Sequence, residues 1–229
     1  MTGSHVAGGT SEYPTLAQIK ELFAQIETGR ITKERMQSFL RGEMGNISTL
    51  LAGWQKFYHD LFGLKVDFSG LVVPTKRKGF NRLIVVAQGI TPQQYYDKCA
   101  ELFTSWKWTD RNLDDIVHSE WIAKDRAYAV WFRDTVEADN DLKNLSYNDL
   151  KKKGIPGITL EERLLMELNY FKESGNHLDI KNVTLCAGSH YLDGSVPAVG
   201  WVPGGREVCV SWYHPGYSDA YLRSRRAVR

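Results

Sequence analysis

The fold class follows from residues 183–213, whose sequence is VTLCAGSHYLDGSVPAVGWVPGGREVCVSWY. Turn-forming residues divide this segment twice, at Asp193-Gly194 and at 203–206, where the sequence is Pro-Gly-Gly-Arg. The pieces between the turns are rich in Val, Trp and Tyr, which are typical of strands. The segment therefore predicts a three-stranded antiparallel meander with strands at 183–191, 196–202 and 207–213.

Helical patterns precede this meander. Apolar side chains recur every three or four residues over 16–26, and Thr32 and Ser48 are suited to cap two further helices. The last of the three is expected to end at Gly63, and it carries a wide apolar stripe that includes Trp54 and Phe57. Such a stripe most often faces a core and less often a partner.

The middle of the chain alternates between strand and helix signals. A basic turn at 76–79 separates two short apolar runs that predict strands at 71–73 and 83–86, and a third strand is predicted at 128–132. Thr91-Pro92 is typical of a helix start. Thr159 and Glu162 have the spacing of a capping box, and Gly175 is suited to end that helix.

Together these patterns predict an α+β fold, in which N-terminal helices pack with a mainly antiparallel sheet that ends in the three-stranded C-terminal meander. The expected domain organisation is a flexible tail at 1–13, a helical N-terminal section at 14–63 and an α+β domain at 64–229.

Composition restricts the class of protein. The chain has 229 residues, a formal net charge of +2 and three cysteines, an odd number that argues against a disulfide scaffold and favours a cytoplasmic location. No apolar run approaches the ~20 residues that a membrane-spanning helix needs, so no membrane partner is expected. The N-terminal sequence MTGSHVAGGT has neither the basic nor the apolar region of a signal peptide.

Two cysteines and two histidines near the C-terminus suggest a zinc site formed by Cys186, His190, Cys209 and His214. The spacing argues against it. Four residues along a strand separate the first pair by roughly 13 Å, and an odd spacing places Cys209 and His214 on opposite faces of a regular strand. We therefore expect no metal and no other cofactor. Cys186 as a nucleophile, with His190 nearby, is also disfavoured, because the sequence shows neither a base within hydrogen-bonding reach nor a positive environment, and residues 185–187 are typical of a core strand.

Other catalytic signals are weak. Carboxylates cluster after the strand at 128–132, and their residue types suit Mg²⁺, but an acidic, solvated turn is the more frequent meaning of such a cluster. They are Asp134, Glu137, Asp139 and Asp141. No GxxxxGK[ST], GxGxxG, GxSxG or HExxH motif is present, which counts modestly against nucleotide-dependent enzymes and the commonest hydrolases.

Basic clusters supply the leading functional hypothesis. They lie at 76–82, at 151–153 and at the C-terminus, where arginines follow a group of aromatic residues. Basic and aromatic side chains together suit single-stranded nucleic acid through phosphate contacts and base stacking. The hypothesis is a non-catalytic module that binds nucleic acid, with a surface formed by Trp212, His214, Tyr217, Arg223, Arg225 and Arg226. The terminal arginines could instead pair with the acidic turns.

Two alternatives stay open, and the sequence does not decide whether the protein is an enzyme. One is a hydrolase with a pocket lined by His190, Asp193 and His214, which requires a histidine within hydrogen-bonding reach of a carboxylate. The other is a protein-interaction domain that uses the N-terminal helices and exposes an apolar patch around Trp54 and Phe57. The oligomeric state is not encoded in any recognisable pattern.

Several phrases of the second half are distinctive: 157–165 (GITLEERLL), 177–179 (HLD), 185–189 (LCAGS), 193–197 (DGSVP) and 222–225 (LRSR). On these phrases the chain, from about residue 155 onward, resembles an uncharacterised group of short bacterial proteins with no assigned activity. The resemblance implies a bacterial, cytoplasmic setting and carries no catalytic or binding residues with it.

Overall fold

The computed structural model describes residues 14–31, 36, 40 and 43–229. The chain divides into two compact units, Met1–Ser48 and Thr49–Arg229. The first unit contains α1 (Leu16–Glu27), which begins with a capping box at Thr15. The predicted tail at 1–13 and Thr32, the expected cap of the second helix, lie outside the described residues. No helix among the described residues is both long and apolar enough to cross a bilayer.

The larger unit contains three sheets. The strands of the largest follow the order β2-β8-β7-β5-β9, that is, Ser105–Lys107, Glu207–Tyr213, Val196–Val202, Val183–Leu185 and Leu222–Arg223. Two antiparallel pairs complete the set: β1 (Arg82–Val86) with β4 (Tyr128–Phe132), and β3 (Val117–Ser119) with β6 (Ser189–Tyr191). The predicted α+β class with a mainly antiparallel sheet is confirmed. Strands β5, β7 and β8 form its C-terminal meander, and β2 and β9 join it in parallel.

The first strand of the meander is shorter than the sequence predicts. The expected strand at 183–191 breaks into β5 and β6, with turn residues between them, and β6 pairs with β3 instead of β7. The break occurs at Gly188, where an added Cβ would lie 2.8 Å from the Gly157 carbonyl oxygen. Only glycine permits this close approach of two backbones. The strand predicted at 71–73 is an irregular segment in the structure.

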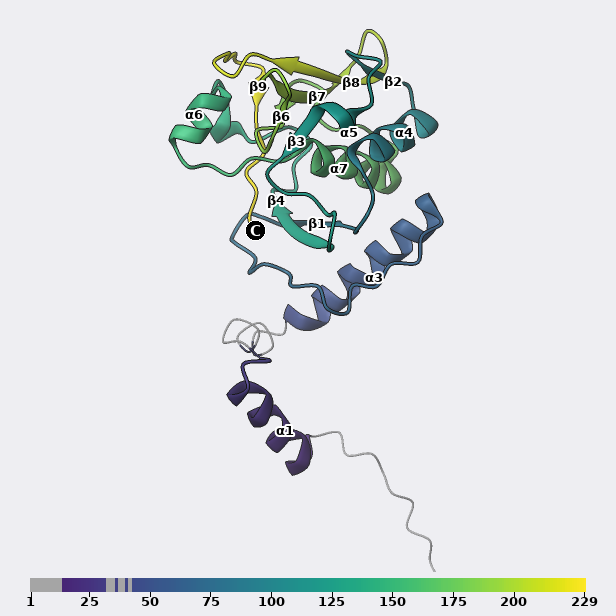
Figure 1. The fold of residues 1–229 in the computed structure, drawn as a ribbon. Coiled ribbons are helices and arrows are strands. Elements are labelled where there is room, and N and C mark those ends of the chain that lie inside the picture. The colour runs from purple at the N-terminus through teal and green to yellow at the C-terminus, as the bar shows by residue number, and fades with distance from the viewer. Residues whose placement is uncertain (1–13, 32–35, 37–39, 41–42) are drawn as a thin grey trace, which may run out of the picture. The chain divides into compact units, whose positions relative to one another are not determined.

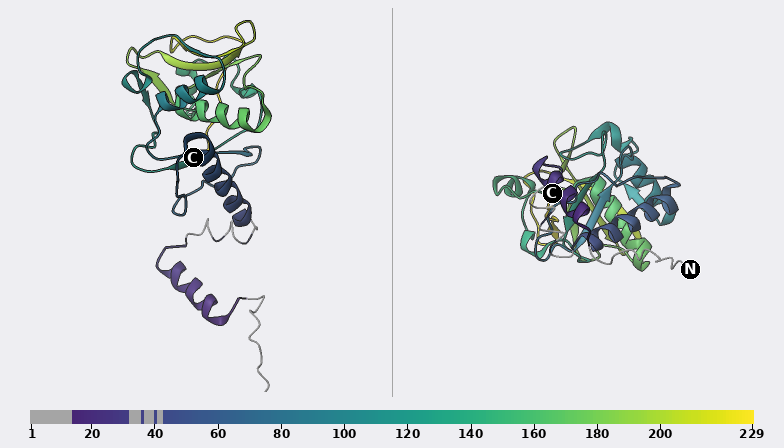
Figure 2. Two further views of the ribbon diagram at one scale, coloured as in Figure 1. Left: turned by 90° about the vertical axis from the view of Figure 1, so that its right-hand side faces the viewer. Right: turned by 90° about the horizontal axis from the view of Figure 1, so that it is seen from below.

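Helix α7 (Leu160–Ser174) lies at the centre of the larger unit (Figures 1 and 2). It packs against β7 on one side and β1 on the other, and it also contacts α4 (Pro92–Leu102). The predicted capping box is confirmed, and Gly175 ends the helix in the left-handed conformation, with φ of 68°. All residues from Leu160 to Leu168 are buried, including the polar side chains of this part of the helix, whereas Lys172, Glu173 and Ser174 at its C-terminal end are exposed.

A network of ion pairs compensates the charges that α7 buries. Arg163 binds Asp179 through Nε and Nη2, at 2.9 and 2.8 Å from the same carboxylate oxygen, and its Nη1 lies 2.7 Å from Glu167. Arg225 binds the other oxygen of Asp179 at 2.7 Å and donates to two backbone carbonyls. Burial alone would lower the pKa of Arg163, but the two carboxylates raise it. Both arginines are therefore paired with carboxylates in the core.

The same network fixes the path of the C-terminal segment. Arg225 is buried, its carbonyl oxygen accepts a hydrogen bond from the Ile158 amide, and Val228 pairs with Trp131 on the edge of β4. The chain therefore crosses the start of α7 and reaches the outer side of β4. Arg229 consequently lies beside Glu162, at 2.8 Å.

Two side chains of helix α3 (Glu43–Phe62) donate hydrogen bonds to backbone carbonyls of β1. The Trp54 indole donates to the Leu83 carbonyl, and the Tyr58 hydroxyl donates to the Val85 carbonyl. For this reason residues from Thr49 onward belong to the larger unit, whereas the sequence placed the whole helix in an N-terminal section. Trp54 and Phe57 are buried, so the exposed patch expected around them does not form.

The short elements that remain are α5 (Leu113–Ile116), α6 (Tyr147–Lys152) and a 3₁₀ turn at Asn140–Leu142. Helix α6 covers a second, smaller apolar cluster, which contains Leu150, Leu185 and Val196.

We predict that Asp179→Asn lowers the free energy of unfolding by about 3–5 kcal/mol, because it removes the carboxylate that two buried arginines share. Asparagine tolerates the positive φ of 55° at this position, so backbone strain does not contribute. Urea unfolding measures the difference. The control is Asp193→Asn at an exposed turn, for which we expect a change within about 0.5 kcal/mol. Equal values for the two variants would contradict the role of the network.

Candidate functional site

A cleft of about 1050 Å³ opens on the side of the larger unit that carries β4. It lies between the irregular segment 65–77, which follows α3, the approach to β4 at 121–129, and the last two residues, 228 and 229. Three parts of the chain that are far apart in sequence therefore form one concave surface. A cleft of this size is typical of small-ligand and oligomer binding sites.

The segment 65–77 keeps its place without belonging to a sheet. The Val66 carbonyl accepts from the Gln55 side chain, and the Pro74 carbonyl accepts from the Trp131 indole at 2.9 Å. Phe68 is buried against Tyr58, with ring centroids 6.1 Å apart. These anchors leave the intervening side chains free to face the cleft and solvent.

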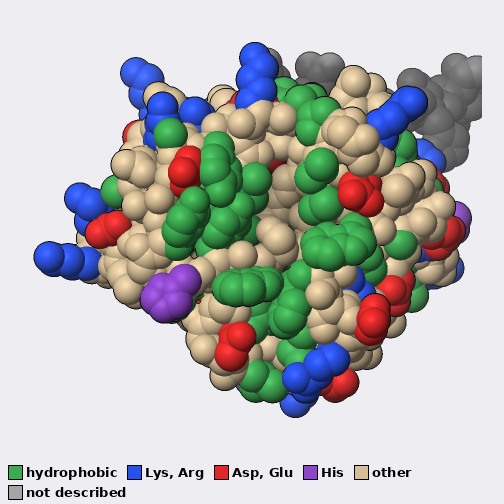
Figure 3. All heavy atoms as spheres, turned by 90° about the horizontal axis from the view of Figure 1, so that it is seen from above, with side chains coloured by type: hydrophobic (Ala, Val, Ile, Leu, Met, Phe, Trp, Pro, Cys, Tyr) green, Lys and Arg blue, Asp and Glu red, His purple; other side chains and the backbone are tan. Residues whose placement is uncertain are grey.

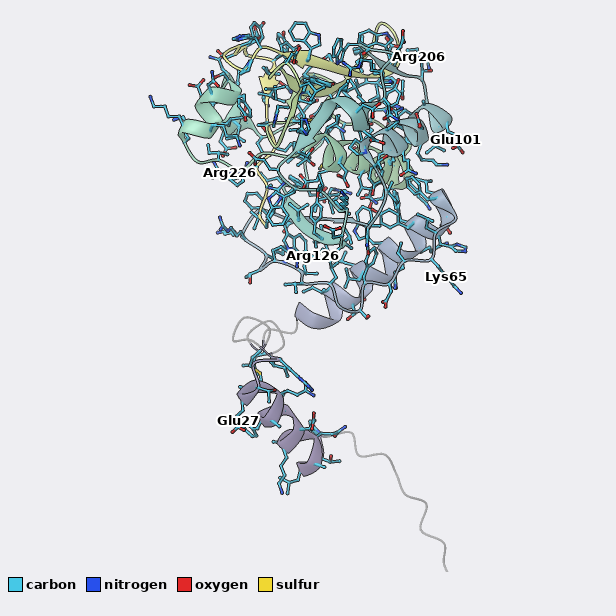
Figure 4. The ribbon with its side chains drawn as sticks, in the orientation of Figure 1. Glu27, Lys65, Glu101, Arg126, Arg206 and Arg226 are labelled. Carbon is cyan, nitrogen blue, oxygen red and sulfur yellow. The ribbon has the colours of Figure 1, made fainter. Side chains whose placement is uncertain are left out.

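Basic side chains dominate the charge of the cleft. Lys65, Arg77 and Arg126 line it and are exposed, and in the part of the chain that the structure describes none of them forms an ion pair. Figure 4 labels Lys65 and Arg126 on the half of this unit that lies opposite Arg206. Asp67 is the one carboxylate among the described lining residues, and it accepts hydrogen bonds from the Ser69 amide and hydroxyl. The cleft therefore carries a net positive charge.

Arg229 also lines the cleft, but its charge is compensated. Its Nη2 lies 2.8 Å from both carboxylate oxygens of Glu162 and 3.4 Å from the Gly157 carbonyl, and its side chain is only 10% exposed. Glu162 is the capping-box residue of α7, which also accepts from the Thr159 amide. The start of the central helix thus holds this arginine at the floor of the cleft.

Trp121 stands over that floor. Its ring lies 5.3 Å from the Arg229 guanidinium carbon and 5.7 Å from the ring of Tyr128, and it is 42% exposed. Tyr128 is buried, and burial together with the neighbouring Glu162 and Glu161 carboxyl groups raises the pKa of its hydroxyl. The cleft therefore combines an accessible indole with three unpaired cations.

Glu161 is a second buried carboxyl group at the start of α7. It is 1% exposed, and its Oε1 has no hydrogen-bond partner among the residues described. Burial, assisted by Glu162 and Asp114, raises the pKa of Glu161 to about 8. This carboxyl group is therefore mainly protonated at neutral pH.

The predicted binding residues are not brought together on one surface. Trp212 and Tyr217 are both exposed, but Tyr217 stacks on Tyr213, at 5.2 Å, and adjacent residues of a strand point to opposite faces. Trp212 approaches Trp108 instead, at 6.3 Å. His214 is exposed, and its Nδ1 accepts from a nearby backbone amide. Apolar side chains do gather over the five-stranded sheet (Figure 3).

The C-terminal arginines of the predicted surface face inward to different degrees. Arg225 is buried in the ion-pair network, where no ligand can reach it. Arg223 is half-buried and donates to the Ala138 carbonyl at 3.4 Å. The Arg226 amide binds the Asp139 carboxylate, and its guanidinium lies 3.9 Å from Asp141. Arg226 therefore pairs with the acidic turn, which is the alternative that the sequence leaves open, whereas the carboxylate partner of Arg225 is Asp179.

The acidic turn itself is occupied by protein partners. Arg82 binds Asp134 at 2.7 Å, and Arg133 binds both Asp139 and Asp141. Glu137 accepts from the Asn182 side chain. Burial raises the pKa of Asp139 despite its hydrogen bond to the Arg226 amide. These carboxylates hold strands and loops together.

The predicted hydrolase residues contact different neighbours and not one another. His190 on β6 faces His118 on β3, with ring centroids 5.6 Å apart. Asp193 accepts from the Ser195 amide and hydroxyl, hydrogen bonds that lower the pKa of its carboxyl group. Neither residue, nor His214, lines the cleft.

A histidine does meet a carboxylate elsewhere. His177 Nδ1 lies 2.9 Å from Glu167, and the imidazole stacks on Trp201 at 3.8 Å with an interplanar angle of 7°. The rings of Phe103 and Phe171 also lie within about 5 Å of it. This histidine is packed among aromatic rings rather than in a pocket, so the geometry does not support a general base.

The surroundings of Cys186 and Cys209 favour the neutral thiol over the thiolate. Burial raises the pKa of the Cys186 thiol, and burial together with Glu207 raises that of Cys209 to about 11. Within the described residues, no three His, Cys, Asp or Glu side chains gather in a group that could hold a metal ion.

Of the unpaired cations that line the cleft, the sequence pattern singles out only the one in the basic turn at 76–79. The basic turn at 76–79 contains Arg77, which lines the cleft. Lys65, Arg126 and Trp121 are single residues without a local pattern, and only the tertiary fold brings them together. No protein-family model matches the chain, and neither does any curated protein or solved structure.

We predict that Glu161→Gln stabilises the protein increasingly as the pH rises from about 4.5 to 8. The folded pKa of this carboxyl group exceeds its unfolded value, so the unfolded state releases the proton first and the wild type loses about 1.4 kcal/mol per pH unit relative to the variant. Urea unfolding at pH 5 and pH 8 measures this. Glu101→Gln, at an exposed site on α4, serves as the control. A benefit from Glu161→Gln that is equal at both pH values would contradict the prediction.

Proposed function

We propose that the chain is a non-catalytic binding module whose ligand is nucleic acid, held in the basic cleft. The observation that carries the proposal is the set of three exposed cations, Lys65, Arg77 and Arg126, around one concave surface with a single lining carboxylate. Phosphate groups are the ligands that such unpaired cations favour, and arginine can bind them through two hydrogen bonds at once.

The geometry supports binding better than catalysis. The residues that line the cleft include no cysteine and no histidine, and its tyrosine hydroxyl is buried. Its one lining carboxylate, Asp67, already accepts two hydrogen bonds from Ser69. General acid–base chemistry needs a titratable group within hydrogen-bonding reach of the substrate. The cleft therefore supplies positive charge and surface, which are the requirements of a binding site.

A polyanion is a better match than a single small anion because the cations stand on separate walls of the cleft. Lys65 and Arg77 lie on the segment that follows α3, and Arg126 lies on the approach to β4. Successive phosphates along one strand can contact such a set simultaneously. The net charge of +2 does not oppose this, since local clustering decides electrostatic attraction over short distances.

We predict salt-dependent binding of a fluorescein-labelled 12-nucleotide DNA, measured by fluorescence anisotropy between 50 and 200 mM NaCl. Three phosphate contacts give a slope of log K against log salt of about −2, because each contact on a single strand contributes about −0.7. The double variant Arg77→Ala/Arg126→Ala retains Lys65, so its slope is expected near about −0.7.

The matched control removes two charges outside the cleft, in Lys152→Ala/Lys153→Ala, where both lysines are exposed at the end of α6. Its slope is expected to equal that of the wild type. Equal weakening by both double variants would show that total charge, not the cleft, is responsible. Absence of oligonucleotide binding at 50 mM NaCl, or binding only to anionic lipid vesicles, would overturn the proposal.

A further inference from the structure

Trp121 differs from the other exposed aromatic residues because a fixed cation supports it. The indole is 42% exposed, lines the cleft and lies 5.3 Å from the Arg229 guanidinium carbon. Trp106 is exposed to a similar extent, 47%, but it stands on the edge strand β2 and does not line the cleft. The chain thus offers one indole inside the basic cleft and a comparable one outside it.

The support beneath Trp121 is rigid. Arg229 is bound to both oxygens of Glu162, and Glu162 is fully buried at the first turn of α7. An arginine so engaged is not available to a phosphate, because its charge is already compensated. Its role is to hold the indole, because a cation beside the face of an aromatic ring is attracted to it.

We infer that Trp121 is a stacking platform for an unpaired base, so that the ligand of the cleft is single-stranded nucleic acid rather than a duplex. This inference rests on the proposed function and specifies its ligand. The cations at the walls bind the phosphates, and the accessible part of the indole receives the face of one base. In a duplex both faces of each internal base are covered by its neighbours, so the platform has nothing to bind.

The arrangement separates affinity into two parts. Phosphate contacts from Lys65, Arg77 and Arg126 act on any nucleic acid and depend on salt. Stacking on Trp121 acts only where a base is free, and it depends little on salt because no counterion is released. A ligand that keeps its phosphates but lacks bases therefore isolates the contribution of the indole.

The test compares three labelled 12-mers by fluorescence anisotropy at 50 mM NaCl: oligothymidylate, whose bases stack weakly on one another, an abasic strand of equal length, and the oligothymidylate duplex with its complement. We expect the wild-type protein to bind oligothymidylate about 5- to 100-fold more tightly than the abasic strand. In Trp121→Ala the ratio is expected to fall to near one, with affinity for the abasic strand unchanged. Trp121→Phe is expected to keep part of the ratio.

Trp106→Ala is the matched control and is expected to keep the wild-type ratio. The ratio is measured within each variant, so a partly unfolded sample does not change it. Equal binding of oligothymidylate and the abasic strand by the wild type, preferential binding of the duplex, or an unchanged ratio in Trp121→Ala would overturn the inference while leaving nucleic-acid binding intact. Failure of all three ligands to bind would remove the proposed function itself.

Discussion

The burial of the first nine residues of α7 on all sides is the constraint on which the rest of the larger unit depends. This part of the helix lies between two sheets and has no solvent-facing stripe, yet it includes Glu161, Glu162, Arg163 and Glu167. An isolated charge in such a position costs several kcal/mol, so each needs a partner or must be neutral. Arg163 is paired with both Glu167 and Asp179, Glu162 is paired with Arg229, and Glu161 retains its proton at neutral pH.

The ion pairs of these buried charges connect the core to the outer surface. Arg225 completes the network around Asp179 and thereby fixes the C-terminal segment against the start of α7. Arg229 follows in the same segment and reaches Glu162, which places a cation beneath Trp121. The distinctive phrases of the second half, GITLEERLL, HLD and LRSR, supply most of this network. The architecture of the core therefore explains why these phrases contain charged residues.

The fold was more predictable than the site, for reasons that particular elements illustrate. The capping boxes at Thr91 and Thr159 and the turn at 203–206 act over a few residues, so the sequence displays them directly. Strand β2 has three residues and β9 has two, which is too short for any periodic pattern. The break at Gly188 depends on the close approach of Gly157, 31 positions earlier, and no local signal reports such a contact.

The cleft escaped prediction because clusters in sequence do not decide which charges remain free. The chain has 29 basic and 27 acidic residues, and in the larger unit arginines and carboxylates meet repeatedly, as at Arg82–Asp134, Arg133–Asp139 and Arg226–Asp141. The positive charge of the arginine-rich C-terminus is therefore largely compensated. Lys65 and Arg126 are each inconspicuous, but the fold places them across a concave surface where they share one neighbouring carboxylate. The cleft is positive because most of the nearby carboxylates pair with other arginines. Which cations remain unpaired is therefore visible only in the three-dimensional structure.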